Sequence, residues 1–304
     1  MKATLHVTIV AALPFLVACQ AKPNAESVSA APESTIKQVN DFWFSGAELC
    51  RYDLKQSRYG QIHPGHAEFI FVTEPFDLQG QVKSDRGGAG SVPILKLNAL
   101  RTFNTGLYSY RTMLSTFTPI EPLDAPHALK ETFSVQDWCG QVFTQINRHG
   151  SDWRIQSFSY FQSEGDGDSK LPNEDAWLEE ELFTAVRLNP ASLPMGKFQM
   201  MPSQMFFRFI HQDPTVFAAE GSLTKQGEQL TYTVTYPDLS RKLTITFDEA
   251  FPYIIRSWSE GNERSGLSTT ATLTHREMNV NYWELNRPKQ ASLRKDLGLD
   301  PVPN

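Results

Sequence analysis

The chain has 304 residues, of which 40% are hydrophobic and 20% charged, and its formal net charge is −6 at pH 7. This length is sufficient for one large β domain or two small ones with a sizeable core. The modest acidic excess, without any block of lysines or arginines, argues against nucleic acid or an anionic phospholipid surface as the main partner.

The first 18 residues carry one charged side chain, Lys2, followed by an apolar run that ends in Leu16-Val17-Ala18-Cys19. A basic residue, an apolar run and small residues, in that order, are typical of a secretory signal. The run is shorter than the roughly 20 apolar residues that span a bilayer. Its last four residues resemble a bacterial lipobox. We therefore expect a lipoprotein signal peptide over residues 1–18; ordinary signal cleavage, an uncleaved anchor and a buried first helix remain alternatives.

Cleavage at the lipobox would make Cys19 the first residue of the mature chain and the site of lipidation. Each buried lipid CH₂ contributes about 0.8 kcal/mol, so several acyl chains together give stable anchoring. Gln20 follows the cysteine, where aspartate is the usual signal for inner-membrane retention. The resemblance thus implies a periplasm-facing outer-membrane lipoprotein, attached to the membrane through Cys19.

Residues 19–38 are rich in Ala, Ser, Pro, Glu and Lys and show no hydrophobic periodicity. Such a composition buries too little apolar surface to offset the conformational entropy of the chain. We expect a flexible tether here, with a short edge strand as the alternative. Residues 291–304 are expected to form a C-terminal tail.

Apolar and polar residues alternate through much of residues 39–290, and turn residues separate the alternating stretches. This pattern predicts short antiparallel strands rather than β-α-β units. We therefore expect one mainly β (α+β) domain over residues 39–290, built as a twisted antiparallel meander or an open half-barrel. The clearest predicted strands are His66–Thr73, Leu107–Phe117, Phe133–Gln136, Trp153–Phe161, Thr231–Tyr236, Lys242–Phe247, Tyr253–Glu260 and Leu267–Thr274.

One segment, residues 174–188, breaks the strand pattern. Its apolar residues Leu178, Leu182 and Val186 recur every four positions, and Asn173 is a suitable N-cap. We expect an amphipathic helix there, packed across one face of the sheet or in the mouth of an open barrel.

Cys50 and Cys139 remain once Cys19 is lipidated, and an oxidising compartment permits a disulfide between them. Two buried thiols are the alternative. A reactive Cys139, with His127 or His149 as its base, would make the protein a thiol hydrolase, but nothing in the spacing selects either histidine.

Three further motifs were tested for chemistry. His63-Pro64-Gly65-His66 has two metal-ligating side chains, yet a zinc or copper site needs more ligands, so we interpret it as an exposed tight turn. The acidic stretch Glu164–Asp168 lacks the spacing of a calcium loop. The glycine-rich stretch Gly87–Gly90 lacks the lysine of a phosphate-binding loop. We expect neither a metal nor another cofactor.

Aromatic residues are abundant, with 20 Phe, 9 Tyr and 6 Trp. Ordinary core packing accounts for such a number, but a concave β surface lined by aromatic and methionine side chains could also hold an apolar ligand.

Three stretches, Glu48–Gly60 running into Ile70–Glu74, then Phe103–Gly106 and Gln136–Gly140, carry a family resemblance over most of residues 45–190. The chain resembles an uncharacterised family of bacterial envelope proteins, often lipoproteins, sometimes labelled septum formation inhibitor Maf. Maf nucleotide pyrophosphatases themselves are cytosolic α/β proteins that start with Ser-x-Ser-Pro-Arg-Arg, which this chain lacks. No catalytic residue is carried over from them.

These observations predict a lipid-anchored envelope protein with a non-catalytic binding or assembly role, whose partner is an apolar ligand or another envelope protein. The alternative is an envelope hydrolase or metal-dependent enzyme that uses Cys139 or the His63/His66 pair.

Overall fold

The structure is a computed structural model that describes residues 25–299, except 125, 174 and 263–265. The lipobox and Cys19 lie outside the described residues. None of the helices in the described part of the chain is both long and apolar enough to cross a membrane.

Most of the described chain forms a single sheet of 17 strands. The strands are β1 (Glu26–Ser27), β2 (Ala47–Arg58), β3 (Gln61–Asp77), β4 (Val82–Lys83), β5 (Ser91–Thr105), β6 (Tyr108–Pro119), β7 (Lys130–Asp137), β8 (Gly140–His149), β9 (Asp152–Ser159), β10 (Gly167–Pro172), β11 (Trp177–Leu178), β12 (Gly196–Met201), β13 (Phe217–Gln226), β14 (Gln229–Tyr236), β15 (Arg241–Asp248), β16 (Ile255–Asn262) and β17 (Leu267–Val280).

The helices are few and short. They are α1 (Ile36–Trp43), α2 (Glu181–Leu188), α3 (Gln204–Ile210) and α4 (Leu293–Asp296), with 3-10 turns η1 (Pro190–Ser192), η2 (Tyr282–Glu284) and η3 (Pro288–Gln290).

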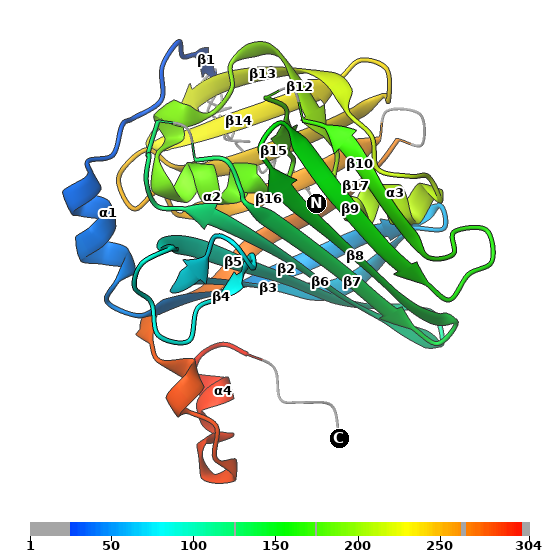
Figure 1. Ribbon diagram of the computed structural model, residues 1–304, viewed down its shortest axis with the longest axis horizontal. Coiled ribbons are helices and arrows are strands. Elements are labelled where there is room, and N and C mark those ends of the chain that lie inside the picture. Colours follow the sequence, from blue (N-terminus) through cyan, green and yellow to red (C-terminus); the bar gives the residue numbers. More distant parts are fainter. Residues whose placement is uncertain (1–24, 125, 174, 263–265, 300–304) are drawn as a thin grey trace, which may run out of the picture.

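The long strands form an antiparallel meander. β12 to β17 pair in sequence, β17 then pairs with β2, and β2, β3 and β5 to β10 continue the order. The sheet is strongly curved and open, with β13 to β17 on one side of α2 and β2, β3 and β5 to β9 on the other (Figure 1). The expected mainly β fold, an open antiparallel sheet, is confirmed.

The predicted helix begins later than the pattern over residues 174–188 suggested, because α2 starts at Glu181. Trp177 and Leu178 instead pair with Met200 and Met201 in a short parallel ladder. Asn173 does not cap the helix, since its side chain accepts from the backbone N–H of Asp175 and donates to the carbonyl of Gly150. All eight residues of α2 are buried, so the helix lies within the curve of the sheet instead of presenting one face to water.

Aromatic rings from both halves of the sheet meet around α2. Phe69 of β3 stacks on Trp258 of β16 with ring centroids 6.0 Å apart, and Phe183 of α2 meets Phe69 edge-on at 5.4 Å. Burial of such large side chains contributes about 25 cal/mol per Å² of apolar surface. The packing of this core explains why the helix and the two strand sets form one unit.

The chain N-terminal to α1 lies against the domain. β1 pairs with β13, the backbone N–H of Val28 donates to the carbonyl of Leu223 at 3.0 Å, and that of Ser34 donates to Asn189 Oδ1 at 3.0 Å. Within the expected tether of residues 19–38, residues 25–38 are therefore held by the sheet edge and by the first turn of α1, whose N-cap Thr35 forms a capping box with Gln38.

Residues 281–299 leave the sheet after β17. The turns η2 and η3 and the helix α4 have no buried residue. Figure 1 shows this orange-to-red segment below the sheet, and Gly298 near its end packs against the side chain of His275 on β17.

Candidate functional site: the rim and the cleft beside α3

The two cysteines of the domain are free thiols, and the disulfide considered between Cys50 and Cys139 is not formed. Cys50 lies on β2 and is 1% exposed, whereas Cys139 is exposed in the turn between β7 and β8. The strands β3, β5 and β6 separate β2 from β7. Neighbouring strands lie about 4.8 Å apart, so the separation far exceeds the Cα distance of about 7 Å that limits a disulfide. Burial, followed by the charge of Glu48, raises the pKa of the Cys50 thiol.

Neither histidine considered as a base for Cys139 lies beside it. His149 ends the ten-residue strand β8, at whose other end Gly140 follows Cys139. His127 Nδ1 is 3.0 Å from Glu181 Oε1, and its ring packs against Trp177. The thiol hydrolase therefore has no assembled Cys–His pair among these residues.

The motif His63–His66 is part of strand β3, and the expected tight turn is wrong. The turn lies earlier, at Tyr59 and Gly60, because Pro64 and Gly65 pair in register with β2. In a regular strand, side chains three positions apart point to opposite faces, so the two imidazoles cannot share a ligand. Among the described residues, no group of three or more His, Cys, Asp or Glu side chains could hold a metal.

The acidic stretch after β9 is tied down by basic side chains. Glu164 Oε1 accepts from Arg208 Nη1 at 2.8 Å and lies 2.8 Å from His211 Nδ1. Asp168 forms a bidentate ion pair with Arg154. Burial raises the pKa of Glu164, but hydrogen bonds from His211 and Ser159 and the charge of Arg208 hold it below its usual value. The stretch thus connects the edge of the sheet to α3.

A cluster of buried glutamates occupies the interior next to α2. Glu179 accepts from Tyr236 and is paired with Arg241, whereas Glu131 and Glu180 each have one carboxylate oxygen without a hydrogen-bond partner in the described chain. Burial, followed by the charge of Glu179, raises the pKa of Glu180 to about 8. Burial also raises the pKa of Glu131 well above its usual value.

The space next to Glu180 is small. A void of about 10 Å³ is lined by Glu180, Arg101, Phe69 and Met205, among others. A cavity of roughly 10–15 Å³ holds one water molecule. An apolar ligand larger than a water molecule would therefore fit here only if the surrounding side chains moved.

Exposed apolar and aromatic side chains gather at one end of the strands. Tyr59, Leu107, Trp138 and Tyr160 are 58%, 84%, 70% and 79% exposed, and we call these four residues the rim. They lie in the turns that follow β2, β5, β7 and β9, which all run in the same direction in the antiparallel order. Tyr108 connects two of them, since its hydroxyl donates to Tyr59 at 3.2 Å and its ring centroid lies 6.4 Å from that of Trp138.

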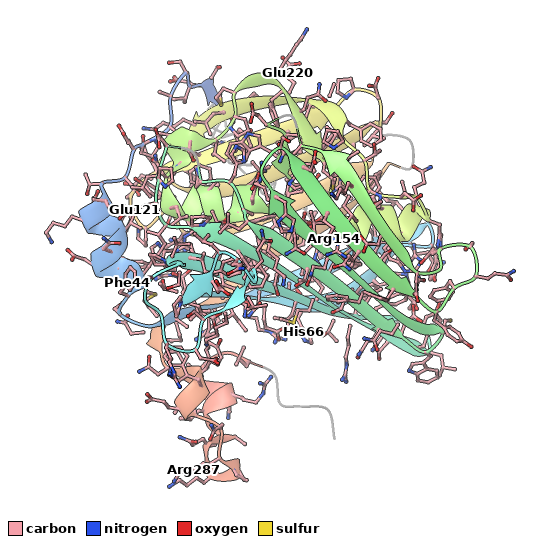
Figure 2. All side chains as sticks on the ribbon, in the orientation of Figure 1. Phe44, His66, Glu121, Arg154, Glu220 and Arg287 are labelled. Carbon is pink, nitrogen blue, oxygen red and sulfur yellow. The ribbon has the colours of Figure 1, made fainter. Side chains whose placement is uncertain are left out.

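The rim and the N-terminal segment lie on different sides of the molecule. The hairpin tips after β5 and β7 are at the lower right of Figure 1, whereas residues 25–43 run along its left side. Phe44, which follows α1 and is 57% exposed, lies at the left in Figure 2. Apolar groups clustered at loop tips commonly mark an interaction surface.

Beside the rim is a polar cleft of about 340 Å³ between α3 and the inner face of β8 and β9. Its floor includes Val142, Thr144 and Ser157, and its other wall includes Phe207 and Arg208 of α3. The helix is held at both ends, because Ser203 caps its first turn and Arg208 pairs with Glu164. The cleft therefore has preformed walls.

Comparisons of this chain with protein-family models, curated proteins and solved structures found no match.

Neither the rim nor the cleft was predicted from the sequence. Trp138 did carry a signal, since it is a large apolar residue just after a predicted strand, where turn residues are usually polar. Leu107 was instead included in the predicted strand Leu107–Phe117, whereas β6 begins at Tyr108. Thr144, Ser157 and Arg208 come from three separate elements, so no sequence motif connects them.

Proposed function

We propose that this chain is a lipid-anchored protein of the cell envelope, facing the periplasm from the outer membrane, with a non-catalytic binding or assembly role. The lipobox at Leu16–Cys19 supports the anchoring. The binding role rests on one observation, the exposed rim at the ends of four strands.

The short segment between Cys19 and the domain would keep the N-terminal side of the domain near the membrane and leave the rim accessible to a partner. Only residues 20–24 separate Cys19 from the first described residue, and an extended chain spans at most about 3.6 Å per residue, so the anchor lies within roughly 20 Å of residue 25. Strand β3 alone has 17 residues, which at about 3.3 Å each extend over more than 50 Å. A domain held at the N-terminal side would direct the rim away from the anchoring bilayer.

The filled interior favours a surface partner over an apolar ligand. The void beneath α3 has room for about one water. The rim, by contrast, is already exposed and needs no rearrangement to make contact.

Anchoring is tested by replacing Cys19 with alanine in cells that make the full-length chain and labelling with radioactive palmitate. The native chain should incorporate label and fractionate with outer membranes, and the C19A chain should do neither. Equal membrane association of both chains, without label in either, would contradict lipid anchoring.

The binding role is tested in cells with a photo-crosslinking amino acid in place of Leu107. Phe44, which is exposed on the other side of the molecule, is the matched control position. We expect a discrete adduct from position 107 that disappears when Trp138 is also changed to serine, and no such adduct from position 44. Identical adducts from both positions would contradict a partner surface at the rim.

A further inference from the structure

The polar cleft between α3 and strands β8 and β9 has side chains whose chemistry suits one class of ligand. We propose that it binds a neutral saccharide through the hydroxyl groups on the cleft floor, with the bound chain reaching the exposed ring of Tyr160, which follows the cleft residue Ser159. This inference deepens the proposed function and rests on it only for the assumption that the rim side of the domain is open to ligands.

A ligand on the floor of the cleft would meet side chains, because the backbone N–H and C=O groups there are already hydrogen-bonded. β8 pairs with β7 and β9, and β9 also pairs with β10, so the main-chain donors and acceptors of both strands are engaged in ladders. A peptide bound as an added strand needs an unpaired edge. A ligand on this floor must therefore be recognised by side chains such as Thr144 and Ser157.

Several hydroxyl and amide side chains line the cleft. Thr144 and Ser157 face each other as a cross-strand pair, and Gln212 lies on the opposite wall. Within the described part of the chain, none of these three side chains forms a hydrogen bond with another residue. They can donate to and accept from a ligand at the same time, which matches the dual character of a sugar hydroxyl.

The charges in the cleft are largely balanced. Glu164 is neutralised by Arg208, with His211 at the same oxygen, which leaves Asp213 as the remaining carboxylate. Arg208 lies beneath these groups with its Nε buried and without a partner in the described chain. An ionic ligand would require a surplus of one sign of charge, whereas this lining suits an uncharged polar molecule.

An exposed aromatic side chain follows the cleft in the chain, because Tyr160 comes directly after Ser159, which lines the cleft. Tyr160, which is 79% exposed, follows β9, and its ring covers Gly140, where a Cβ atom would lie 2.9 Å from Tyr160 Cδ1. The ring of Tyr160 therefore packs closely against Gly140, and a side chain at position 140 would displace it. Aromatic side chains offer large apolar area together with a polar group, and the volume of about 340 Å³ lies within the range of small-molecule sites.

Calorimetric titration of the full-length, detergent-solubilised protein with chitotetraose and maltotetraose tests the proposal. At least one of the two should bind saturably, with a Kd of about 1 mM or tighter. Thr144→Val keeps the side-chain shape but removes the hydroxyl, and it should weaken binding by about 2- to 10-fold. Tyr160→Ala should weaken binding at least as much, because the stacking surface is lost. Ser134→Ala on the opposite face of β7 is the matched control and should leave the Kd unchanged.

Three results would overturn the proposal: no saturable binding of either saccharide, equal weakening by Thr144→Val and Ser134→Ala, or saturable binding of tetra-alanine in place of the saccharides. Circular dichroism of each variant separates loss of binding from loss of folding. The photo-crosslinking at position 107 does not involve Thr144, so a failed saccharide titration with an intact rim adduct would refute this inference and leave the proposed function standing.

Discussion

Replacing Glu180 with glutamine should make the protein more stable at alkaline pH. Glu180 is 6% exposed, and its Oε2 atom has no hydrogen-bond partner among the described residues. Burial, together with the charge of Glu179, raises its pKa from 4.5 to about 8. The folded protein therefore holds this proton at pH values where the unfolded chain has released it.

The size of the effect follows from this difference in proton binding. Stability is greatest at pH values where Glu180 is protonated in both states, and it falls as the pH rises from 4.5 through about 8. Each pKa unit corresponds to about 1.4 kcal/mol, so the full shift sets an upper limit of about 5 kcal/mol. Glutamine has no proton to lose, and E180Q should therefore avoid this loss. A gain of a few kcal/mol at pH 9 would raise Tm by several degrees, at about 2–4 °C per kcal/mol for a domain of this size.

Urea unfolding of the native and E180Q chains across pH 5 to pH 9 measures the difference directly. The two free energies of unfolding should be similar at pH 5 and should diverge with rising pH, E180Q being the more stable. Glu220→Gln is the matched control, because Glu220 is exposed on β13 at the top of Figure 2. An E180Q chain that lost stability with rising pH as steeply as the native chain would show that Glu180 does not cause the loss.

Two further predictions concern the surroundings of Glu48 and Cys50, which are buried on β2. Arg187→Met should lower the free energy of unfolding by about 3–5 kcal/mol, because Glu48, whose pKa Arg187 holds at about 2 against the effect of burial, would lose its main counter-charge. The double variant with Glu48→Gln should recover part of this loss, and a single-variant effect below about 1 kcal/mol would contradict the buried pair. In a Cys19→Ala chain without reductant, maleimide should label Cys139 in the native protein and Cys50 only after unfolding in guanidinium chloride. Failure to label Cys139 until a reductant is added would instead indicate a disulfide.

The strands were largely predictable from local pattern. Thr231–Tyr236 and Lys242–Phe247 alternate strictly, and they form most of β14 and most of β15, joined by a turn. Side chains of successive residues point to opposite faces of a sheet, so one buried face leaves a period of two in the sequence. That local cause does not depend on which strands become neighbours.

The errors arose where distant contacts decided the local structure. Trp177 and Leu178 fit a helical stripe by spacing, but the structure pairs them with β12 and starts α2 only at Glu181. Likewise, Pro64-Gly65 has the composition of a turn, yet β2 and β5 pair on both sides of this segment and keep it extended. In both places, ladder hydrogen bonds to other segments outweighed local propensity.

The class of fold, the strand meander and the expectation of a lipid anchor at Cys19 follow from local patterns, because each depends on residues close together in the chain. The separation of Cys50 from Cys139, the burial of glutamates beside α2 and the position of the cleft next to α3 depend instead on contacts between distant segments. The physical reason is the curvature of the sheet. It sets which strand ends come together and which side chains lose water, and neither property is encoded in any single stretch of the chain.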